Sequence, residues 1–239
     1  MSIDPRRCAV VGVGFLGSRL LALLSGARGV ELRRGEDAAD PSVWEGHPLP
    51  ERIFCCQSTR GGDAAAYRRA YLGVLGALPG AARVIWCSAL SVGAAEGARA
   101  EVLRTAEQGV LARGGVVARL AALWGEGRCE LLRRHCAGEP RLPGPPQRRL
   151  NYVHADDAAR ALLLLAEAPS GCYDVCGESL THAEAYAMLE ELTGIPAAAQ
   201  ESAAGHRGHS SALPDTAALR ALGWQPQHQL KELCGNHAH

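Results

Sequence analysis

Two kinds of hydrophobic pattern alternate along the first half of the chain. Short, almost uncharged apolar runs have the length of buried strands, and longer segments between them have apolar residues at helical spacing. Strands that are apolar on both faces and alternate with helices are typical of βαβ units. The pattern therefore predicts an α/β fold with a doubly wound parallel sheet. The predicted strands are 8–13, 29–33, 52–56, 83–88 and 115–120, and the predicted helices are 15–26, 65–78 and 98–113.

The alternation changes after residue 120. A Pro-, Gly- and Arg-rich stretch at 138–150 predicts a surface loop, and a helix at 156–168 and a short strand at 171–177 follow. Thr181 begins a further helix as its N-cap, with Glu184 completing a capping box and Gly194 ending it. We expect residues 1–120 to form a nucleotide-binding core. Residues 121–239 are expected to complete that core and to form a small C-terminal α/β lobe.

Three glycines lie where the first strand gives way to the first helix. Gly12, Gly14 and Gly17 form the pattern G-x-G-x-x-G. In this setting the glycines permit a tight turn, close approach of the backbone to a pyrophosphate, and close packing of helix on strand. We expect a Rossmann-type dinucleotide site in which this turn, with Phe15 and Leu16, holds the phosphates. The alternative is a loop that has kept this shape without binding.

Two further segments are expected to reach the dinucleotide. The second strand runs into Arg33 and Arg34, and a guanidinium can pair with a 2′-phosphate that a carboxylate would repel. This favours NADP over NAD, unless Glu31 binds the ribose; we expect Glu31 to lie within the strand. The loop that follows the third strand leaves its carboxyl end near the crevice. It supplies Cys56, Gln57 and Ser58.

Composition excludes several classes of partner. Lys plus Arg and Asp plus Glu are 25 each, so no basic field favours nucleic acid or anionic lipid. No apolar run approaches the length of about 18 residues that spans a bilayer, and the sequence before the first strand leads us to expect no signal peptide. The nine cysteines include no C-x2-C pair, so we expect no metal site. The chain is expected to be cytoplasmic.

Four stretches resemble the extended branch of the short-chain dehydrogenase/reductase superfamily, which contains the NAD(P)-dependent epimerases and dehydratases. "RVIWCSALSVG" is similar to the strand that ends in serines, "VVARLAALWGEGR" to the L-R-x-x-x-x-Y-G-P-G segment, and "NYVHADDAA" with "GCYDVCGE" to the N-x-V-H-V-D-D-x-A helix and its following strand. "LGWQP" resembles the closing L-G-W-x-P turn. With the glycine turn, the likeness covers nearly the whole chain. The G-x-G-x-x-G turn and the short length resemble atypical members of this branch.

The resemblance fails where the family carries its catalytic pair. Relatives have Y-x-x-x-K-x-x-x-E-Q on one helix, in which lysine and the cofactor ribose lower the pKa of the tyrosine so that it can exchange a proton. Alignment on Glu107 and Gln108 places Leu103 at the lysine and Arg99 at the tyrosine. Ser88 stands at the family's serine. It would bond a carbonyl or hydroxyl near the nicotinamide, or merely cap the strand.

Other polar residues are expected to be structural. Tyr67 and Tyr71 lie four apart on a helix and are interpreted as core packing. His154 is interpreted as a hydrogen-bonded strut, and Asp156 and Asp157 as carboxylates that cap the helix they begin.

These observations favour an NADP-dependent oxidoreductase that reduces a small carbonyl or imine and takes its proton from water or an unconventional donor. The alternative is a non-catalytic NAD(P)-binding sensor or scaffold, since the tyrosine and lysine are lost. We expect a small-molecule substrate. The helices at 65–78 and 98–113 are compatible with the homodimer common in the family.

Overall fold

Two sheets form the framework of the computed structural model, which describes residues 3–31, 35–57, 63–93, 96–199 and 213–236. The larger has six parallel strands in the order β2-β1-β3-β4-β5-β8. In the smaller, β6 is parallel and β9 antiparallel to β7. The strands are β1 (Cys8–Val11), β2 (Arg28–Val30), β3 (Arg52–Cys55), β4 (Arg83–Ala89), β5 (Val116–Leu120), β6 (Ala122–Trp124), β7 (Arg149–His154), β8 (Gly171–Val175) and β9 (Glu178–Thr181).

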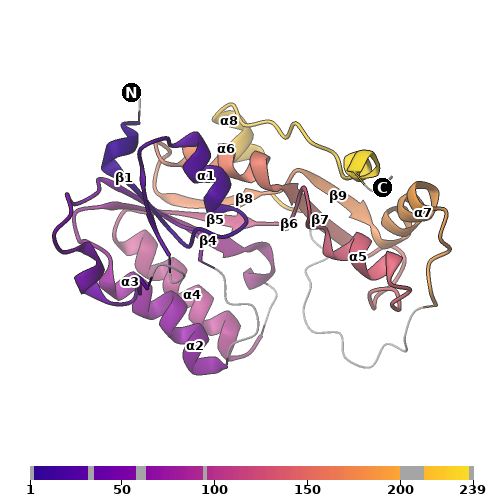
Figure 1. Ribbon diagram of the computed structural model, residues 1–239. Coiled ribbons are helices and arrows are strands. Elements are labelled where there is room, and N and C mark those ends of the chain that lie inside the picture. Colours follow the sequence, from indigo (N-terminus) through magenta and orange to yellow (C-terminus); the bar gives the residue numbers. More distant parts are fainter. Residues whose placement is uncertain (1–2, 32–34, 58–62, 94–95, 200–212, 237–239) are drawn as a thin grey trace.

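Helices cover both faces of the large sheet, as Figure 1 shows. One face carries α1 (Gly17–Leu23), α6 (Ala155–Leu165) and the short α8 (Ala217–Ala221). The other face carries α2 (Ala64–Arg68), the π-helical turn η4 (Arg69–Gly73), α3 (Val74–Ala77) and α4 (Ala98–Ala112). The small sheet packs with α5 (Glu130–Cys136) and α7 (His182–Thr193). The 3-10 turns are η1 (Pro5–Arg7), η3 (Pro41–Trp44), η5 (Leu90–Gly93) and η6 (Leu230–Asn236).

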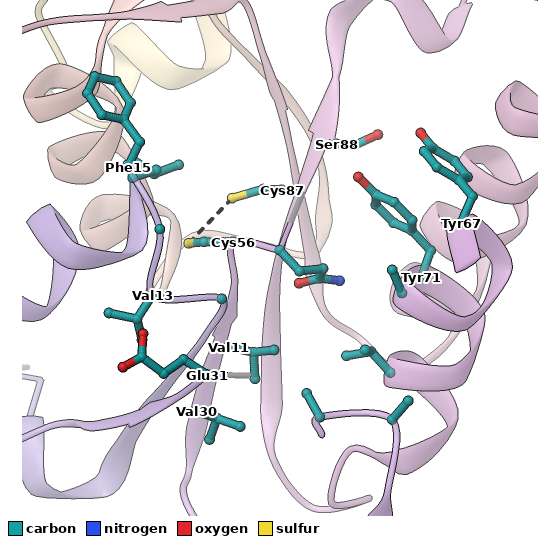
Figure 2. A pocket seen from close by; sticks show the side chains of 18 of the residues that line it. Val11, Val13, Phe15, Val30, Glu31, Cys56, Tyr67, Tyr71, Cys87 and Ser88 are labelled. Carbon is teal, nitrogen blue, oxygen red and sulfur yellow. Dashed lines mark hydrogen bonds between the residues drawn. The ribbon is translucent and has the colours of Figure 1, made fainter. Parts of the chain in front are cut away.

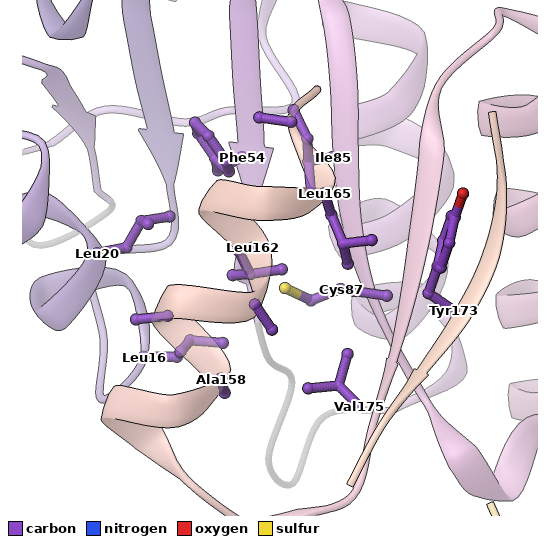
Figure 3. Close-up of a cluster of buried hydrophobic side chains, with 14 of the residues drawn as sticks. Leu16, Leu20, Phe54, Ile85, Cys87, Ala158, Leu162, Leu165, Tyr173 and Val175 are labelled. Atoms are coloured by element: carbon purple, nitrogen blue, oxygen red, sulfur yellow. The ribbon is translucent and has the colours of Figure 1, made fainter. Parts of the chain in front are cut away.

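Side chains of β1 show why the strands are apolar without interruption. Successive residues point to opposite faces of a sheet. Val10 accordingly packs with α1 and α6, and Val11 with the helices of the other face. Figure 3 shows the first of these clusters, in which Leu20 and Leu162 meet the sheet residue Phe54. The predicted doubly wound α/β fold is confirmed.

The strand order reverses next to β1. After β2 the chain passes through η3 and enters β3 on the other side of β1. Loops leaving β1 and β3 therefore turn toward opposite faces, and a crevice opens between them at the carboxyl ends of the strands. The C-terminal half of the chain contributes the last strand of this sheet, since β8 pairs with β5.

Helix ends in the C-terminal half agree only in part with expectation. The capping box of Thr181 and Glu184 is confirmed, and Gly194 ends α7 in the left-handed conformation. The capping role expected for Asp156 and Asp157 is wrong, because His154 is the N-cap of α6 and its ring accepts from the Asp156 backbone N–H. None of the helices in the described part of the chain has the length and apolarity needed to span a membrane.

Asp157 has a different structural task. Its side chain is fully buried, and it accepts hydrogen bonds of 3.0 Å from the backbone N–H groups of Gln227 and His228. Arg160 pairs with the same carboxylate. The carboxylate thus fixes the segment after Trp224 against α6, and the Trp224 ring N–H donates to the Asp157 backbone carbonyl at 3.0 Å.

Candidate active site

A cavity of about 890 Å³ lies over the carboxyl ends of β1, β3 and β4 (Figure 2). The glycine turn after β1 forms one wall, and the residues that end or follow β3 and β4 form the floor. Residues of α2, η4 and α4 form the opposite wall. The cavity therefore occupies the reversal point of the strand order, where ligands of open α/β sheets bind.

Each glycine of the turn meets a different steric demand. Gly12 has φ +84°, and a Cβ there would lie 2.7 Å from the backbone nitrogen of Gln57. A Cβ on Gly17 would collide with the Gly12 carbonyl oxygen and lie 3.3 Å from Val10. Nothing lies within 4 Å of the corresponding position on Gly14. Two glycines thus allow close backbone packing, and the third leaves open space on the cavity side.

Phe15 and Leu16 complete this wall in different ways. Phe15 has its ring between two guanidinium groups, those of Arg19 at 4.1 Å and Arg128 at 4.6 Å from the ring centroid. Leu16 borders the cavity, but its side chain belongs to the core under α1. Of this pair, Phe15 is therefore the one whose side chain contacts charged groups.

Acidic residues lie at the end of the cavity next to β2. β2 ends at Val30, so the expectation that Glu31 lies within the strand is wrong; Glu31 is the first residue after it and lines the cavity. Glu36 pairs with Arg28 at 2.9 Å. Arg69 binds Asp37 and holds the pKa of that carboxyl below its usual range. Arg33, Arg34 and Ser58, named from the sequence, lie outside the described residues.

Two thiols meet on the cavity floor. Cys55, the last residue of β3, pairs in register with Trp86, so Cys56 directly after β3 lies beside Cys87 of β4. Their Sγ atoms are 3.8 Å apart. The thiol of Cys56 and burial together raise the pKa of Cys87 well above its usual value. Cys87 is therefore a neutral thiol at neutral pH.

Two side chains that line the cavity have buried polar atoms without a partner. Gln57 follows Cys56, and neither its amide oxygen nor its amide nitrogen has a hydrogen-bond partner among the described residues. The same holds for the hydroxyl of Ser88, which lies within β4 and is 7% exposed. The capping alternative for Ser88 finds no supporting hydrogen bond in this part of the chain. Buried polar groups are rarely left unpaired, so both positions are suited to a ligand.

Leu103 and Arg99, which the sequence alignment on Glu107 set against the family's lysine and tyrosine, both lie on α4. Leu103 is buried and lines the cavity. The Arg99 guanidinium lies 5.5 Å from the centroid of the Tyr67 ring. Glu107 is buried and makes a two-pronged pair with Arg119 of β5, at 3.1 and 2.6 Å. This pair fixes α4 to the sheet behind the cavity.

Sequence reasoning missed two residues of the site. Tyr67 and Tyr71 do pack with the core, as expected, but both also line the cavity. Their rings are 4.8 Å apart, and Tyr71 packs against Trp86 at 6.0 Å. The four-residue spacing predicted a shared helix face. It could not show that this face turns toward the carboxyl end of β4.

His154 belongs to a cluster that is not part of the cavity wall. Its ring stacks on His228 at 3.8 Å and 20°, and ligand atoms of both lie within 4.8 Å of a carboxylate oxygen of Asp156. Nearly parallel rings do not aim their lone pairs at one point, and Asp156 is already paired with Arg19 at 2.9 Å. Burial lowers the pKa of His154, and the charge of the neighbouring His228 has a smaller effect in the same direction. The arrangement supports a structural role.

No protein-family model matches the sequence, and a search of curated proteins finds no match. Solved structures do match, and they place the chain in the fold shared by NAD-dependent epimerases and dehydrogenases. The resemblance to the extended short-chain dehydrogenases is thereby confirmed at the level of the fold.

Individual structures match over nearly the whole chain. MoeE5 in complex with UDP-glucose and NAD is 23% identical, with 95% of this chain and 96% of that chain covered and a TM-score of 0.72. UDP-glucose 4-epimerase of Thermotoga maritima with UDP-glucose is 18% identical, with 94% and 95% covered and a TM-score of 0.72. A partial consensus L-threonine 3-dehydrogenase is 18% identical, with 96% and 97% covered and a TM-score of 0.76.

Proposed function

We propose that the protein is a nicotinamide-dinucleotide-dependent oxidoreductase that reduces a small carbonyl or imine compound. The observation that carries this proposal is the cavity itself, with a sterically required glycine turn on one side and the unpartnered groups of Gln57 and Ser88 on its floor. Its volume fits a ligand of cofactor size. Two of the proteins with similar structures, MoeE5 and the UDP-glucose 4-epimerase of Thermus thermophilus, were solved as complexes with NAD.

The described residues fit this cofactor. Open space at Gly14 lets a pyrophosphate approach the backbone of the turn, and the Gln57 amide can bond the ligand from the floor. When bound, the dihydronicotinamide supplies a hydride. Ser88 belongs to β4, and β2 lies on the opposite side of β1 from β4 in the sheet. The unpartnered Ser88 hydroxyl is available to donate a hydrogen bond that orients the substrate's oxygen or nitrogen.

Preference for NADP is part of the proposal and rests on Arg33 and Arg34. The geometry at β2 supplies the competing argument, because Glu31 borders the cavity just after the strand ends. A carboxylate there accepts hydrogen bonds from a ribose and repels a 2′-phosphate. Glu31 therefore favours NAD, whereas Arg33 and Arg34 favour NADP. The two sets of side chains make opposite predictions for the 2′ position of the adenosine ribose.

A non-catalytic sensor or scaffold is the second candidate. Its support is Leu103, which puts an apolar side chain in the wall where relatives place lysine. The cytoplasmic location, the boundary at residue 120 and homodimerisation stay predictions of the sequence.

Fluorescence titration of the purified protein with NADPH and NADH tests the proposal. Gly14→Asp is expected to abolish binding, since its carboxylate would face the phosphates, whereas Gly14→Ala is the matched control and is expected to bind. Glu31→Gln should improve NADPH binding, and Arg33→Gln should weaken it. Absence of binding to both cofactors would refute both candidate functions.

A further inference from the structure

One group of side chains stands where relatives keep their catalytic pair. Ser88 of β4, Tyr67 of α2 and Tyr71 of η4 line the same cavity, and Figure 2 shows their hydroxyl groups directed toward the same end of it. Leu103 of α4 lines the same cavity. The wall that lacks the family's tyrosine thus holds two other tyrosines.

Tyr67 and Tyr71 differ in their exposure to the cavity. Tyr71 is only 8% exposed and is held between the Tyr67 and Trp86 rings. Tyr67 is half-buried and so retains access to a ligand. Tyr71 belongs to the π-helical turn η4, a rare geometry that is frequent at functional sites. Tyr71 therefore supports the ring of Tyr67, and Tyr67 is the one that can reach a substrate.

A cation accompanies Tyr67. Arg99 occupies the position of the family's tyrosine on α4, and its guanidinium lies 5.5 Å from the Tyr67 ring centroid. Relatives place tyrosine and lysine four residues apart on one helix. In this chain the phenol is on α2 and the cation on α4, and the two helices pack side by side (Figure 1).

Other protic groups of the described cavity wall are less suited to donate a proton. The carboxyls of Glu31, Glu36 and Asp37 lie at the β2 end. The thiol of Cys87 is buried and donates a hydrogen bond to the Cys56 sulfur. An aliphatic hydroxyl such as that of Ser88 is a far weaker acid than a phenol.

The protonation state of Tyr67 suits a donor. Burial raises the pKa of its phenol, against smaller opposing effects of the Tyr71 hydroxyl and the Arg99 guanidinium. The phenol is therefore protonated at neutral pH, and Arg99 stabilises the phenolate that remains after transfer.

We propose that Tyr67 is the proton donor of the reduction, that Arg99 is the cation beside it, and that Tyr71 is a positioning residue. The inference rests on the proposed function. Hydride addition to the C=O or C=N carbon leaves an electron pair on the oxygen or nitrogen, and that atom takes the phenolic proton. The Tyr67 phenolate then takes a proton from water, which restores the phenol and releases hydroxide.

Tyrosine labelled with ¹³C at Cζ gives a direct readout of this assignment, because the five tyrosines of the chain give five signals that report ionisation. Tyr67→Phe assigns the signal of interest. NADP⁺ is expected to lower the midpoint of the Tyr67 titration by about one pH unit, since a cationic ring would lie near the phenol. ADP-ribose 2′-phosphate is the control ligand, because it lacks the nicotinamide ring. It should leave the Tyr67 midpoint unchanged.

Controls separate a local effect from a general one. Tyr173 does not line the cavity, and its hydroxyl donates a hydrogen bond of 3.0 Å to the Pro169 carbonyl. The Tyr173 signal should therefore not respond to NADP⁺. Arg99→Gln should raise the Tyr67 midpoint, and Arg99→Lys should restore part of the shift. For any carbonyl compound that the protein reduces, Tyr67→Phe is expected to lower kcat about 100-fold with little change in KM.

The outcomes are distinct for the two proposals. Binding of NADP⁺ without movement of the Tyr67 midpoint would overturn the assignment of Tyr67 and leave the proposed function intact. Failure of both dinucleotides to bind would overturn the proposed function, and the donor assignment with it.

Discussion

The two walls of the cavity are built on different principles. On the β1 wall the demands fall on the backbone, since a Cβ at Gly12 or Gly17 would overlap main-chain atoms. On the α4 wall the cavity is bordered by side chains such as Leu103, which project from a regular helix. Substitutions are therefore tolerated differently on the two walls, because at Gly12 and Gly17 any side chain would meet main-chain atoms.

The largest effect is expected from breaking the β1 wall. Gly12→Ala adds a Cβ at positive φ and against the Gln57 backbone, so we expect a loss of about 2–4 kcal/mol in the free energy of unfolding. Gly14→Ala is the matched control and should stay within about 0.5 kcal/mol. Urea denaturation measures both. Equal stability of the two variants would contradict a backbone-limited wall.

The support behind the α4 wall can be removed without touching the cavity. Glu107→Ala leaves the Arg119 guanidinium without its buried partner, and a loss of about 2–3 kcal/mol in unfolding free energy is expected. NADPH affinity measured by fluorescence should be unchanged, because neither residue borders the cavity. Glu101→Ala, at an exposed site of the same helix, is the control. A stable Glu107→Ala protein that no longer bound NADPH would show that the wall and its support are coupled.

The floor between the walls can be probed through Cys56. Its thiol is half-buried on the cavity floor, so a bound dinucleotide should slow its alkylation by iodoacetamide. About tenfold protection is expected at a ligand concentration of ten times the Kd. Cys136 is exposed on α5 and should react equally fast with and without NADPH. Peptide mass spectrometry measures both rates, and equal protection of the two would argue against a ligand on the floor.

The smallest effect concerns pH, outside both walls. Because the folded-state pKa of His154 is lowered, the unfolded chain binds the proton first as pH falls below about 6.5. Stability should therefore decrease from pH 7 toward pH 5. His228, Asp156, Asp157 and Arg19 all act on this ring. His154→Asn should reduce the slope in urea denaturation, whereas a change at exposed His47 should not; an unchanged slope in His154→Asn would remove His154 as the cause.

The fold was predictable because its evidence is local. Apolar runs such as β1, the helix caps of Thr181 and Gly194, and the glycine turn each depend on residues close together in the sequence. The end of β2 was less accessible, and Glu31 was placed inside a strand that stops one residue before it. Strand ends are set by pairing with β1, which the sequence of β2 alone does not specify.

Only part of the cavity lining was predictable from the sequence. Gly12, Ser88 and Gln57 were expected near a ligand and do line the cavity, whereas Tyr67 was interpreted as core. Its position depends on how α2 packs against α4 and on the π-helical turn η4, and both arise from contacts between distant segments. The structural role of Asp157 was not predicted for the same reason, because its backbone partners Gln227 and His228 lie far from it in the sequence.

Asp157 also bears on how the chain is made. Arg160 pairs with the carboxylate from within α6, but its two backbone partners lie 70 and 71 positions later, so α6 leaves the ribosome long before the N–H groups that complete its hydrogen bonding. Until then, closing α6 onto the sheet would leave this buried carboxylate with only part of its hydrogen bonds. Synthesis interrupted before Gln227 should yield a chain whose α6 face stays open, with its leucines accessible to chaperones and proteases. Quality control of this protein is thus expected to depend on a short segment that contributes nothing to the cavity.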